Sequence, residues 1–322
     1  MKHMKFLSFF LGITFSIVAC SSNNEIIPVP DVDPDGDDGT TEVEFAKGAD
    51  IGWGTEYESK GYNFYNAKGE QRECTALMKE LGLNAIRIRV WVDPSKHGNW
   101  CNTADVVEKA KRAKELGMDV MIDFHYSDWW ADPAQQNKPA SWVGKNLANL
   151  KSAIKDHTVS VLQALKMIGV IPKWVQVGNE IRPGMLWDED VALSGASYNV
   201  TEKDLKDAPA SATDKVVYPM NWANLGAFVT TGYDAVKSVF PDAIVIVHLD
   251  NGWDSGLFTW FFDELKKNGG KWDMIGMSLY PYWSRDAKEG YSSADAVITD
   301  CISNIKALST KYNCDVMVVE TG

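Results

Sequence analysis

The sequence lacks the motifs that mark several large classes of enzyme and binding protein. Its five histidines include no His-x-His and no His-Glu-x-x-His, so a metal-dependent hydrolase has little support. No Gly-x-Gly-x-x-Gly follows the first expected strand and no phosphate-binding loop motif occurs, which counts against a nucleotide-binding sheet. Lysine and arginine number 32 against 44 acidic residues, without an evident basic surface, so we expect no nucleic-acid partner.

The N-terminal segment "MKHMKFLSFFLGITFSIVAC" contains an apolar run of about a dozen residues, which is too short for a membrane-spanning helix. Its basic start indicates an export signal covering residues 1–20. The ending "IVAC" resembles a bacterial lipobox, which implies cleavage before Cys20 and a lipid anchor on that cysteine. The polar "SSNN" that follows favours this over an ordinary signal with a chance cysteine. We therefore expect an exported bacterial lipoprotein of the outer membrane, at the cell surface or the periplasmic face.

Residues 21–44 are rich in Pro, Asp, Gly and Ser and contain no basic residue, which predicts an extended, flexible linker. The stretch from Asp31 to Gly36 has the Asp-x-Asp-x-Asp-Gly pattern of a calcium loop but lacks the distal glutamate of an EF-hand, so a solvated linker is favoured. The remaining residues, 45–322, form the expected folded domain.

Four cysteines follow Cys20, in a chain expected to reach an oxidising compartment, and four cysteines allow three pairings. We expect a disulfide between Cys74 and Cys101. Four buried free thiols are an equally supported alternative.

The expected fold follows from a repeated helix–glycine–strand pattern. Gly82, Gly117 and Gly169 each lie between an apolar-periodic helix and a β-rich run, where a left-handed residue ends a helix. Continuing the pattern predicts seven strands, near 48–53, 85–91, 119–125, 173–179, 243–249, 274–280 and 315–320. It predicts helices near 72–81, 103–116, 147–168, 222–240, 256–267 and 293–312.

Alternating strands and helices imply a parallel sheet, either doubly wound or closed as a barrel. Chemically active side chains at every strand exit favour a (β/α)8 TIM barrel, because such barrels build their active sites there. Since only seven strands are counted, we expect the barrel to be truncated after its seventh strand. A complete form would continue for roughly 40 to 60 residues past Gly322.

Arg87 and Arg89 share one face of the second strand, which points into a barrel, where a charge is costly unless it is paired. We expect Arg87 to form a structural ion pair and Arg89, nearer the exit, to hold a catalytic carboxylate ionised. The third strand ends at His125 and leads into a long loop with Trp129, Trp130 and Trp142. Tryptophan faces suit sugar rings, although at least one of the three is expected only to pack the loop.

Two glutamates end strands that can face each other across the barrel mouth, Glu180 in "VQVGNEI" and Glu320 in "VVETG". Glycoside hydrolysis needs one protonated and one ionised carboxyl group. The fifth exit adds His248, Asp250, Asn251 and Trp253, and the sixth adds Tyr280, Tyr282 and Trp283. A hydroxyl from Tyr280 is placed to bond the nucleophile and Trp283 to form a sugar platform, whereas Trp253 and Tyr282 can be read as rim packing.

Taken together, "DFHYSDWWADP", "VQVGNEI", "HLDNGW", "SLYPYW" and "VVETG" resemble glycoside hydrolase family 53, the endo-β-1,4-galactanases. The resemblance implies that Glu180 is the general acid/base, that Glu320 is the nucleophile and that Asn179 binds the sugar 2-hydroxyl. It places Arg89, His125 and Tyr280 around the nucleophile. The full set of expected substrate-binding residues is Arg89, His125, Asp128, Trp129, Trp130, Asn179, His248, Asp250, Tyr280 and Trp283.

The implied substrate is the β-1,4-galactan of pectic side chains, and the implied reaction retains the configuration at the anomeric carbon. We expect the protein to be a monomer. Some family members hold calcium in a loop after the eighth strand, which this chain does not reach, so we expect no cofactor and no metal. The segment 185–221 is longer than we expect for the corresponding part of the family's core. Two alternatives remain: a lipid-anchored glycan-binding protein with an inactive barrel, and a related clan enzyme acting on mannan or cellulose.

Overall fold

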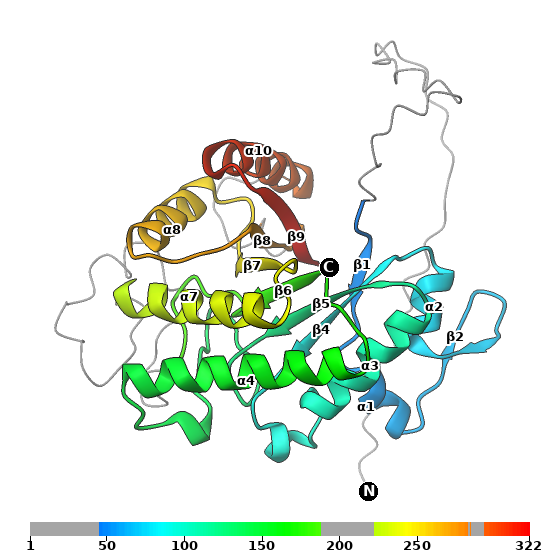
Figure 1. Cartoon of the computed structure of the whole chain (residues 1–322). Helices are drawn as coiled ribbons and strands as arrows, with labels where there is room; N and C mark the ends of the chain where they lie inside the picture. Colours follow the sequence, from blue (N-terminus) through cyan, green and yellow to red (C-terminus); the bar gives the residue numbers. More distant parts are fainter. Residues whose placement is uncertain (1–44, 188–221, 283, 285–292) are drawn as a thin grey trace, which may run out of the picture. The chain divides into compact units, whose positions relative to one another are not determined.

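The computed structural model describes residues 45–187, 222–282, 284 and 293–322 (Figure 1). The predicted export signal, Cys20 and the linker therefore lie outside the described residues, as do Trp283 and most of the segment 185–221. No helix among the described residues is long and apolar enough to span a membrane.

A seven-stranded parallel sheet forms the centre of the folded domain, and all seven expected strands belong to it. Its strands, in spatial order, are β1 (Gly48–Asp50), β4 (Ala85–Val90), β5 (Asp119–Phe124), β6 (Trp174–Val177), β7 (Ile244–Leu249), β8 (Met274–Leu279) and β9 (Asp315–Thr321). The spatial order follows the chain order, which is the topology of a barrel rather than of a doubly wound sheet. Residues of β1 and β9, at the two ends of the sheet, line one common cavity. The sheet is therefore curled into a nearly closed barrel, as expected.

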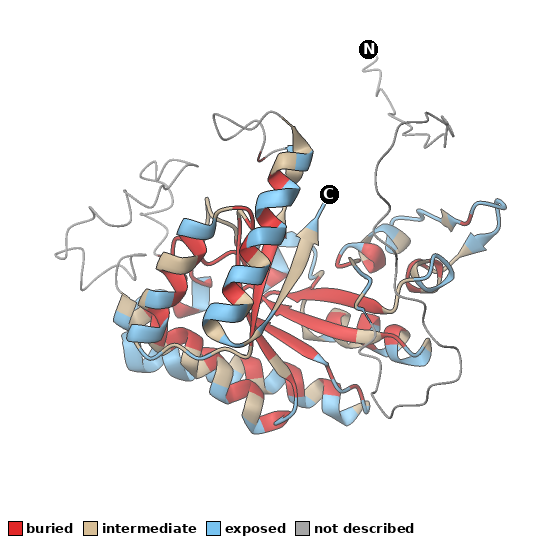
Figure 2. Cartoon of the chain, turned by 90° about the horizontal axis from the view of Figure 1, so that it is seen from above, coloured by how far each residue is buried: buried red, intermediate tan, exposed pale blue. Residues whose placement is uncertain are grey.

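Helices cover the outside of this barrel (Figures 1 and 2). They are α1 (Gly54–Ser59), α2 (Cys74–Glu80), α3 (Thr103–Glu115), α4 (Leu147–Met167), α7 (Trp222–Val239), α8 (Ser255–Lys267) and α10 (Ala294–Tyr312). Two short 3₁₀ helices, η1 (Pro94–His97) and η2 (Ala140–Trp142), lie in loops. In Figure 2 the strands are largely buried, and the helices bury one face and expose the other.

Local sequence sets the helix boundaries. The side chains of Glu73, Asp254 and Ser293 accept hydrogen bonds from backbone N–H groups at the starts of α2, α8 and α10, as N-cap residues do. The three predicted left-handed glycines are confirmed, with φ of 90° at Gly82, 64° at Gly117 and 69° at Gly169.

The two faces of the strands have different surroundings, because side chains alternate along a strand. One face carries residues such as Ile86, Ile88 and Ile122, which pack in the large core with the helices. The other face points into the barrel. Its lower level is a small apolar cluster that includes Met121 and Trp174, and above it lie polar side chains.

The fold corrects three expectations. The first strand ends at Asp50 rather than at residue 53, because Trp53 is already the N-cap residue of α1. A short antiparallel hairpin of β2 (Phe64–Tyr65) and β3 (Gln71–Arg72) was not predicted, since its strands are only two residues long. The expected Cys74–Cys101 disulfide is wrong. All four described cysteines are free, and Cys101 Sγ instead lies 3.4 Å from the carbonyl oxygen of Gly52.

Candidate active site

Glu180 and Glu320 approach each other at the carboxyl ends of their strands. One carboxylate oxygen of each lies within 4.8 Å of the other, and the hydroxyl of Ser278 reaches both, at 2.6 Å from Glu180 and 3.5 Å from Glu320. Both glutamates are largely shielded from solvent. Two carboxyl groups this close can act on the two sides of one bond in a substrate.

Irregular backbone places both glutamates. Gly178 and Glu180 follow β6 with φ of 82° and 48°, and a positive φ is uncommon for a residue with a side chain and typical of functional sites. On the other strand pair, the register between β8 and β9 shifts after Met277, which sets Ser278 opposite Glu320. These two departures from regular structure bring the carboxyl groups to the same level.

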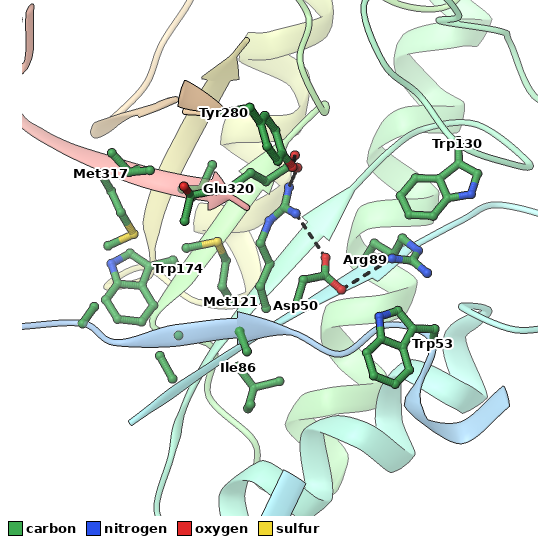
Figure 3. Close-up of a pocket in the computed structure, with 18 residues that line it drawn as sticks. Asp50, Trp53, Ile86, Arg89, Met121, Trp130, Trp174, Tyr280, Met317 and Glu320 are labelled. Atoms are coloured by element: carbon green, nitrogen blue, oxygen red, sulfur yellow. Dashed lines mark hydrogen bonds and ion pairs between the residues drawn. The ribbon is translucent and has the colours of Figure 1, made fainter. Parts of the chain in front are cut away.

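Glu320 has surroundings that favour its ionised form. Arg87 Nη2 lies 2.8 Å from Glu320 Oε1, and the Tyr280 hydroxyl donates to Oε2 over 3.1 Å (Figure 3). Burial alone would raise the pKa of this carboxyl group, but the charge of Arg87, together with the hydrogen bond from Tyr280, holds the pKa below its usual value. A carboxylate that stays ionised at neutral pH is the form a nucleophile needs.

Glu180 is shifted in the opposite direction. Burial, together with the negative charges of Glu320 and Asp250, raises the pKa of Glu180 well above its usual value. The hydrogen bond from Ser278 opposes this rise without overcoming it. Adjacent carboxyl groups with pKa values moved apart are the arrangement of an acid and a nucleophile.

A buried polar network beneath the two glutamates is centred on Arg87. Its guanidinium lies 3.1 Å from Asp50, 2.9 Å from Asp123 and 3.1 Å from the side-chain oxygen of Gln176. Arg87 also donates to Asn179 Oδ1 over 2.9 Å. The expectation that Arg87 is ion-paired is confirmed, and the same side chain also binds Glu320.

Arg89 does not take the position that was expected for it. Its Nη1 lies 3.4 Å from Asp50, and its guanidinium lies 4.0 Å from the centre of the Trp130 ring. Strands in a barrel are staggered, so the height of a residue cannot be counted from the end of its own strand. Arg87, one inward position lower on β4, is level with Glu320.

Asn179, expected to bind a sugar hydroxyl, is held by several bonds. Its Nδ2 donates to the carbonyl oxygen of Ala131 over 2.7 Å, and its Oδ1 lies 3.0 Å from His248 Nδ1. The other nitrogen of His248 lies 2.8 Å from Ser278 Oγ. Burial lowers the pKa of His248 to about 4, so this ring is neutral at pH 7 and carries one N–H. Because Ser278 donates its own proton to Glu180, that N–H is on Nε2 and donates to Ser278 Oγ.

His125 and Asp128 fix the loop after β5. His125 Nε2 lies 3.0 Å from Asp123, and its Nδ1 accepts the backbone N–H of Ala131 over 2.9 Å. Asp128 accepts the backbone N–H groups of Asp93 and Ala140 over 2.9 and 2.8 Å. Both side chains are thus engaged in holding the loop that carries the exposed tryptophans.

Of the three tryptophans in this loop, Trp129 and Trp130 are exposed and Trp142 is buried. Trp142 packs near Tyr126 and His157, which agrees with the expectation that at least one of the three serves packing.

Asp250, which follows β7, forms an ion pair with Arg182 through two hydrogen bonds of 2.8 and 3.0 Å. The positive charge of Arg182 therefore balances the negative charge that Asp250 brings near Glu180.

One group of three side chains among the described residues lies close enough to share a metal ion, namely Glu180, His248 and Glu320. Calcium takes oxygen ligands, six to eight of them, which this group does not offer. Both nitrogens of His248 already lie within hydrogen-bond distance of Asn179 and Ser278. The residues therefore fit a catalytic pair better than a calcium site.

Sequence reasoning missed four site residues: Asp50, Asp123, Gln176 and Ser278. A signal existed for two of them, because Asp123 and Gln176 are polar residues at alternate positions of strands otherwise rich in valine and isoleucine. Inward-facing polar residues on adjacent strands can pair with Arg87. Ser278 gave no such signal, since its place depends on the register shift.

Known proteins are similar to this chain over most of the folded domain. The family model described as glycosyl hydrolase family 53 matches residues 46–322. An arabinogalactan endo-beta-1,4-galactanase of Thermothelomyces thermophilus is 32% identical over 271 residues, covering 82% of this chain and 70% of the relative. An endo-beta-1,4-galactanase of Bacillus subtilis is 28% identical over 87% of this chain and 57% of the relative.

Two solved structures are also similar to this chain. One from a study of two fungal beta-1,4-galactanases has a TM-score of 0.69 and 31% identity, covering 86% of this chain and 73% of that one. The family 53 catalytic domain of Ignisphaera aggregans has a TM-score of 0.69 and 30% identity, covering 86% and 68%. The chain belongs to glycosyl hydrolase family 53.

Proposed function

We propose that the protein is an endo-acting, retaining glycosidase that cleaves β-1,4-galactan, the polymer of pectic side chains. The observation that carries the proposal is the pair Glu180 and Glu320, whose carboxylate oxygens lie within 4.8 Å and whose pKa values are moved in opposite directions. A retaining pair has its carboxyl groups about 5 to 5.5 Å apart, whereas an inverting pair is about 6.5 to 9.5 Å apart.

In the first step the ionised Glu320 attacks the anomeric carbon of the sugar. The glycosidic bond breaks, and its oxygen takes the proton that Glu180 carries because of its raised pKa. Arg87 and Tyr280, which bond the carboxylate of Glu320, hold it in one orientation for the attack. The product of this step is a covalent sugar–Glu320 ester.

In the second step Glu180, now a carboxylate, takes a proton from water. The oxygen of that water attacks the anomeric carbon and displaces Glu320. Two inversions give net retention, and both glutamates return to their starting protonation states. No cofactor or metal enters either step, so we expect activity to survive chelation by EDTA.

The galactan substrate rests on the names of the relatives, several of which are endo-beta-1,4-galactanases, and on family membership. The test is release of reducing ends from β-1,4-galactan, with mannan and cellulose as competing substrates and the anomer of the first product followed by NMR. Glu180→Gln and Glu320→Gln should both abolish release. Initial formation of the α-anomer would refute retention, and binding of galactan by the native chain without release would identify a glycan-binding protein.

We further propose that the chain is exported as a lipoprotein and held on the outer membrane through Cys20. The N-terminal segment supports this by its basic start, its apolar run and the sequence "IVAC". Labelling with a fatty acid should mark the native chain and leave Cys20→Ala unmarked. Equal labelling of both would refute the anchor.

A further inference from the structure

Cys101 and Lys109 form a buried pair of nucleophilic side chains outside the active site. Each residue is 1% exposed, and Lys109 Nζ lies 3.9 Å from Cys101 Sγ. Cys101 is a free thiol, and neither residue takes part in the proposed mechanism. An oxidised cysteine sulfur reacts with a neighbouring thiol or nitrogen, so a thiol in contact with an amine can become covalently linked to it.

Asp105 holds the two residues in place. Its Oδ2 accepts the backbone N–H of Cys101 over 2.6 Å and lies 2.6 Å from Lys109 Nζ. Its Oδ1 accepts the hydroxyl of Thr55 over 2.5 Å. Cys101 adopts a φ of 61°, which is uncommon for a residue with a side chain. The carboxylate of Asp105 is therefore placed to take the proton that Lys109 has to lose before its nitrogen can react.

The carbonyl oxygen of Gly52 contacts both reactive atoms. Lys109 Nζ donates to this oxygen over 2.5 Å, and Cys101 Sγ lies 3.4 Å from it. One acceptor thus keeps the sulfur and the nitrogen on the same side of the loop between β1 and α1. The amine is held against the thiol from two directions, by Gly52 and by Asp105.

A small oxidant can approach this pair from the surface. A cavity of about 670 Å³ is lined by Trp100 and Asn102, which flank Cys101 in the chain, and by Thr55 and Asp105. Burial raises the pKa of the Cys101 thiol, so the thiol is protonated at neutral pH and reacts slowly with bulky thiol reagents. Hydrogen peroxide is small enough to pass between the residues that cover the sulfur.

We propose that Cys101 and Lys109 are a redox-sensitive modification site, at which hydrogen peroxide joins Sγ to Nζ through one oxygen atom. In the first step the thiol is oxidised to a sulfenic acid, and the O–O bond of the peroxide breaks to release one water. In the second step another peroxide removes one hydrogen from the sulfenic acid and one from the amine, and leaves as two waters while the N–O bond forms. Sulfur and nitrogen each lose two electrons, which the two peroxide molecules take up.

The distance between the two atoms favours a bridge through oxygen. A direct S–N bond would require the sulfur and the nitrogen to come closer together than a bridge with an oxygen atom between them, and they are 3.9 Å apart. The bridge is reversible, because two equivalents of a dithiol return the thiol and the amine and release the bridging oxygen as water.

The link also changes contacts that lead to the active site. A nitrogen bonded to oxygen is a much weaker base than an amine, so the link removes the positive charge that Asp105 and the Gly52 carbonyl now contact. The N–H of Gly52 donates to Asp50 over 2.8 Å, and Asp50 lies 3.1 Å from Arg87, which binds Glu320. We therefore expect the linked chain to have a lower kcat/KM.

The test treats the folded native chain with hydrogen peroxide, digests it with trypsin and measures the peptides by mass spectrometry. Trypsin cleaves after a free lysine, so the untreated chain should give the peptide 97–109. The linked chain should instead give a peptide that continues past Lys109 to Lys111 or Arg112. This peptide should be heavier by one oxygen and lighter by two hydrogens than its unmodified form. Dithiothreitol should restore the pattern of the untreated chain.

Cys101→Ser is the matched control, because a hydroxyl keeps the size of the thiol and does not form the link. It should give the peptide 97–109 with and without peroxide. Cys301 is an internal control, since it is 1% exposed and its sulfur lies 3.6 Å from the sulfur of Met277 rather than against an amine. Cys301 should form no link to a lysine under the same treatment.

Three results would overturn the proposal. They are complete cleavage after Lys109 in the treated native chain, a disulfide between Cys101 and Cys74, and a linked peptide that has lost two hydrogens without gaining oxygen. The last of these would identify a direct S–N bond.

Hydrolysis of galactan gives a second readout, which rests on the proposed function. The kcat/KM of the treated native chain should fall and should recover with dithiothreitol, whereas Cys101→Ser should show no reversible loss. Link formation with unchanged kcat/KM would refute the coupling to Asp50. Because the mass measurement needs no activity, a chain that forms the link but hydrolyses no galactan would support the modification site and refute the proposed function.

Discussion

Arg87 Nη2 lies 2.8 Å from Oε1 of Glu320, and the same guanidinium lies 2.9 Å from the fully buried Asp123. One cation therefore serves a structural carboxylate and the candidate nucleophile. Both carboxyl groups have lowered pKa values, in each case because the charge of Arg87 and a side-chain hydrogen bond, with other nearby groups, together outweigh the effect of burial. The protonation state of the nucleophile is thus coupled to the stability of the barrel interior.

Replacing Arg87 with glutamine should move the acid limb of the pH profile of kcat/KM to higher pH. Without the cation, burial and the charge of Asp123 dominate, so the pKa of Glu320 rises and more of it is protonated at a given pH. An adjacent cation shifts a carboxyl pKa by about 1 to 3 units, which sets the expected size. The measurement is kcat/KM against pH on a soluble galactooligosaccharide.

Arg87→Lys is the control for this change, because it keeps the charge and loses the two-nitrogen fork. Its acid limb should stay closer to that of the native chain. Arg87→Gln should also unfold at lower denaturant concentration, since removing one partner of a buried pair costs about 3 to 5 kcal/mol. An acid limb that is the same in all three proteins would show that Glu320 is not the group titrating there.

Replacing Ser278 with alanine should move the other limb of the profile. The Ser278 hydroxyl donates to Glu180 Oε1 over 2.6 Å and lowers the pKa of a group that burial has raised. Without it, the pKa of Glu180 rises further, so the acid stays protonated to higher pH. The basic limb of kcat/KM should therefore shift upward while the acid limb, set by Glu320, moves little. Movement of the acid limb alone would contradict these assignments.

The fold was largely readable from the sequence because its signals are local. Helix-ending glycines such as Gly117, strand runs of valine and isoleucine, and N-cap residues such as Ser293 each act within a few residues of chain. The strand-exit positions of Glu180 and Glu320 followed from the same pattern. The free state of Cys74 and Cys101 could not be read, since a pairing depends on the distance between elements that the sequence does not give.

The partners of each glutamate were harder to predict because they depend on relations between strands. That Arg87 rather than Arg89 contacts Glu320 reflects strand stagger. The contact of Ser278 with Glu180 reflects a register shift. Neither the strand stagger nor the register shift can be read from the alternation of side chains along a single strand. What the sequence does encode is that polar side chains inside a barrel must find partners, which applies to Arg87 and Asp123 alike.

Gly178 gives a prediction about the local backbone. Its φ is 82°, and a Cβ there would lie 2.5 Å from the side chain of Ile181. Gly178→Ala should therefore lower the free energy of unfolding by about 1 to 3 kcal/mol and displace Glu180, two residues on. The free energy of unfolding, measured with denaturant, and kcat should both fall. Gly69→Ala, at φ 78° with open space around the added carbon, is the matched control and should leave kcat unchanged.

His157 predicts how stability depends on pH. Its ring is buried among Phe124, Tyr126 and Trp142, its Nε2 has no hydrogen-bond partner among the described residues, and burial lowers its pKa to about 4. The unfolded chain, in which a histidine has a pKa of about 6.5, therefore binds more protons than the folded chain between these two values. Stability is accordingly full above about pH 6.5 and is lost as the pH falls toward 4.

The size of this loss of stability follows from the lowered pKa of His157. Each pH unit in this window should cost up to about 1.4 kcal/mol of unfolding free energy from His157, in addition to any loss from other groups. His157→Leu keeps an apolar side chain in the site and removes the titrating group. Its free energy of unfolding, measured with denaturant at pH 7, 6, 5 and 4, should fall less steeply than that of the native chain. Parallel curves for the two proteins would mean that His157 binds its proton over the same pH range in the folded and unfolded chains, because only then would its removal leave the slope unchanged.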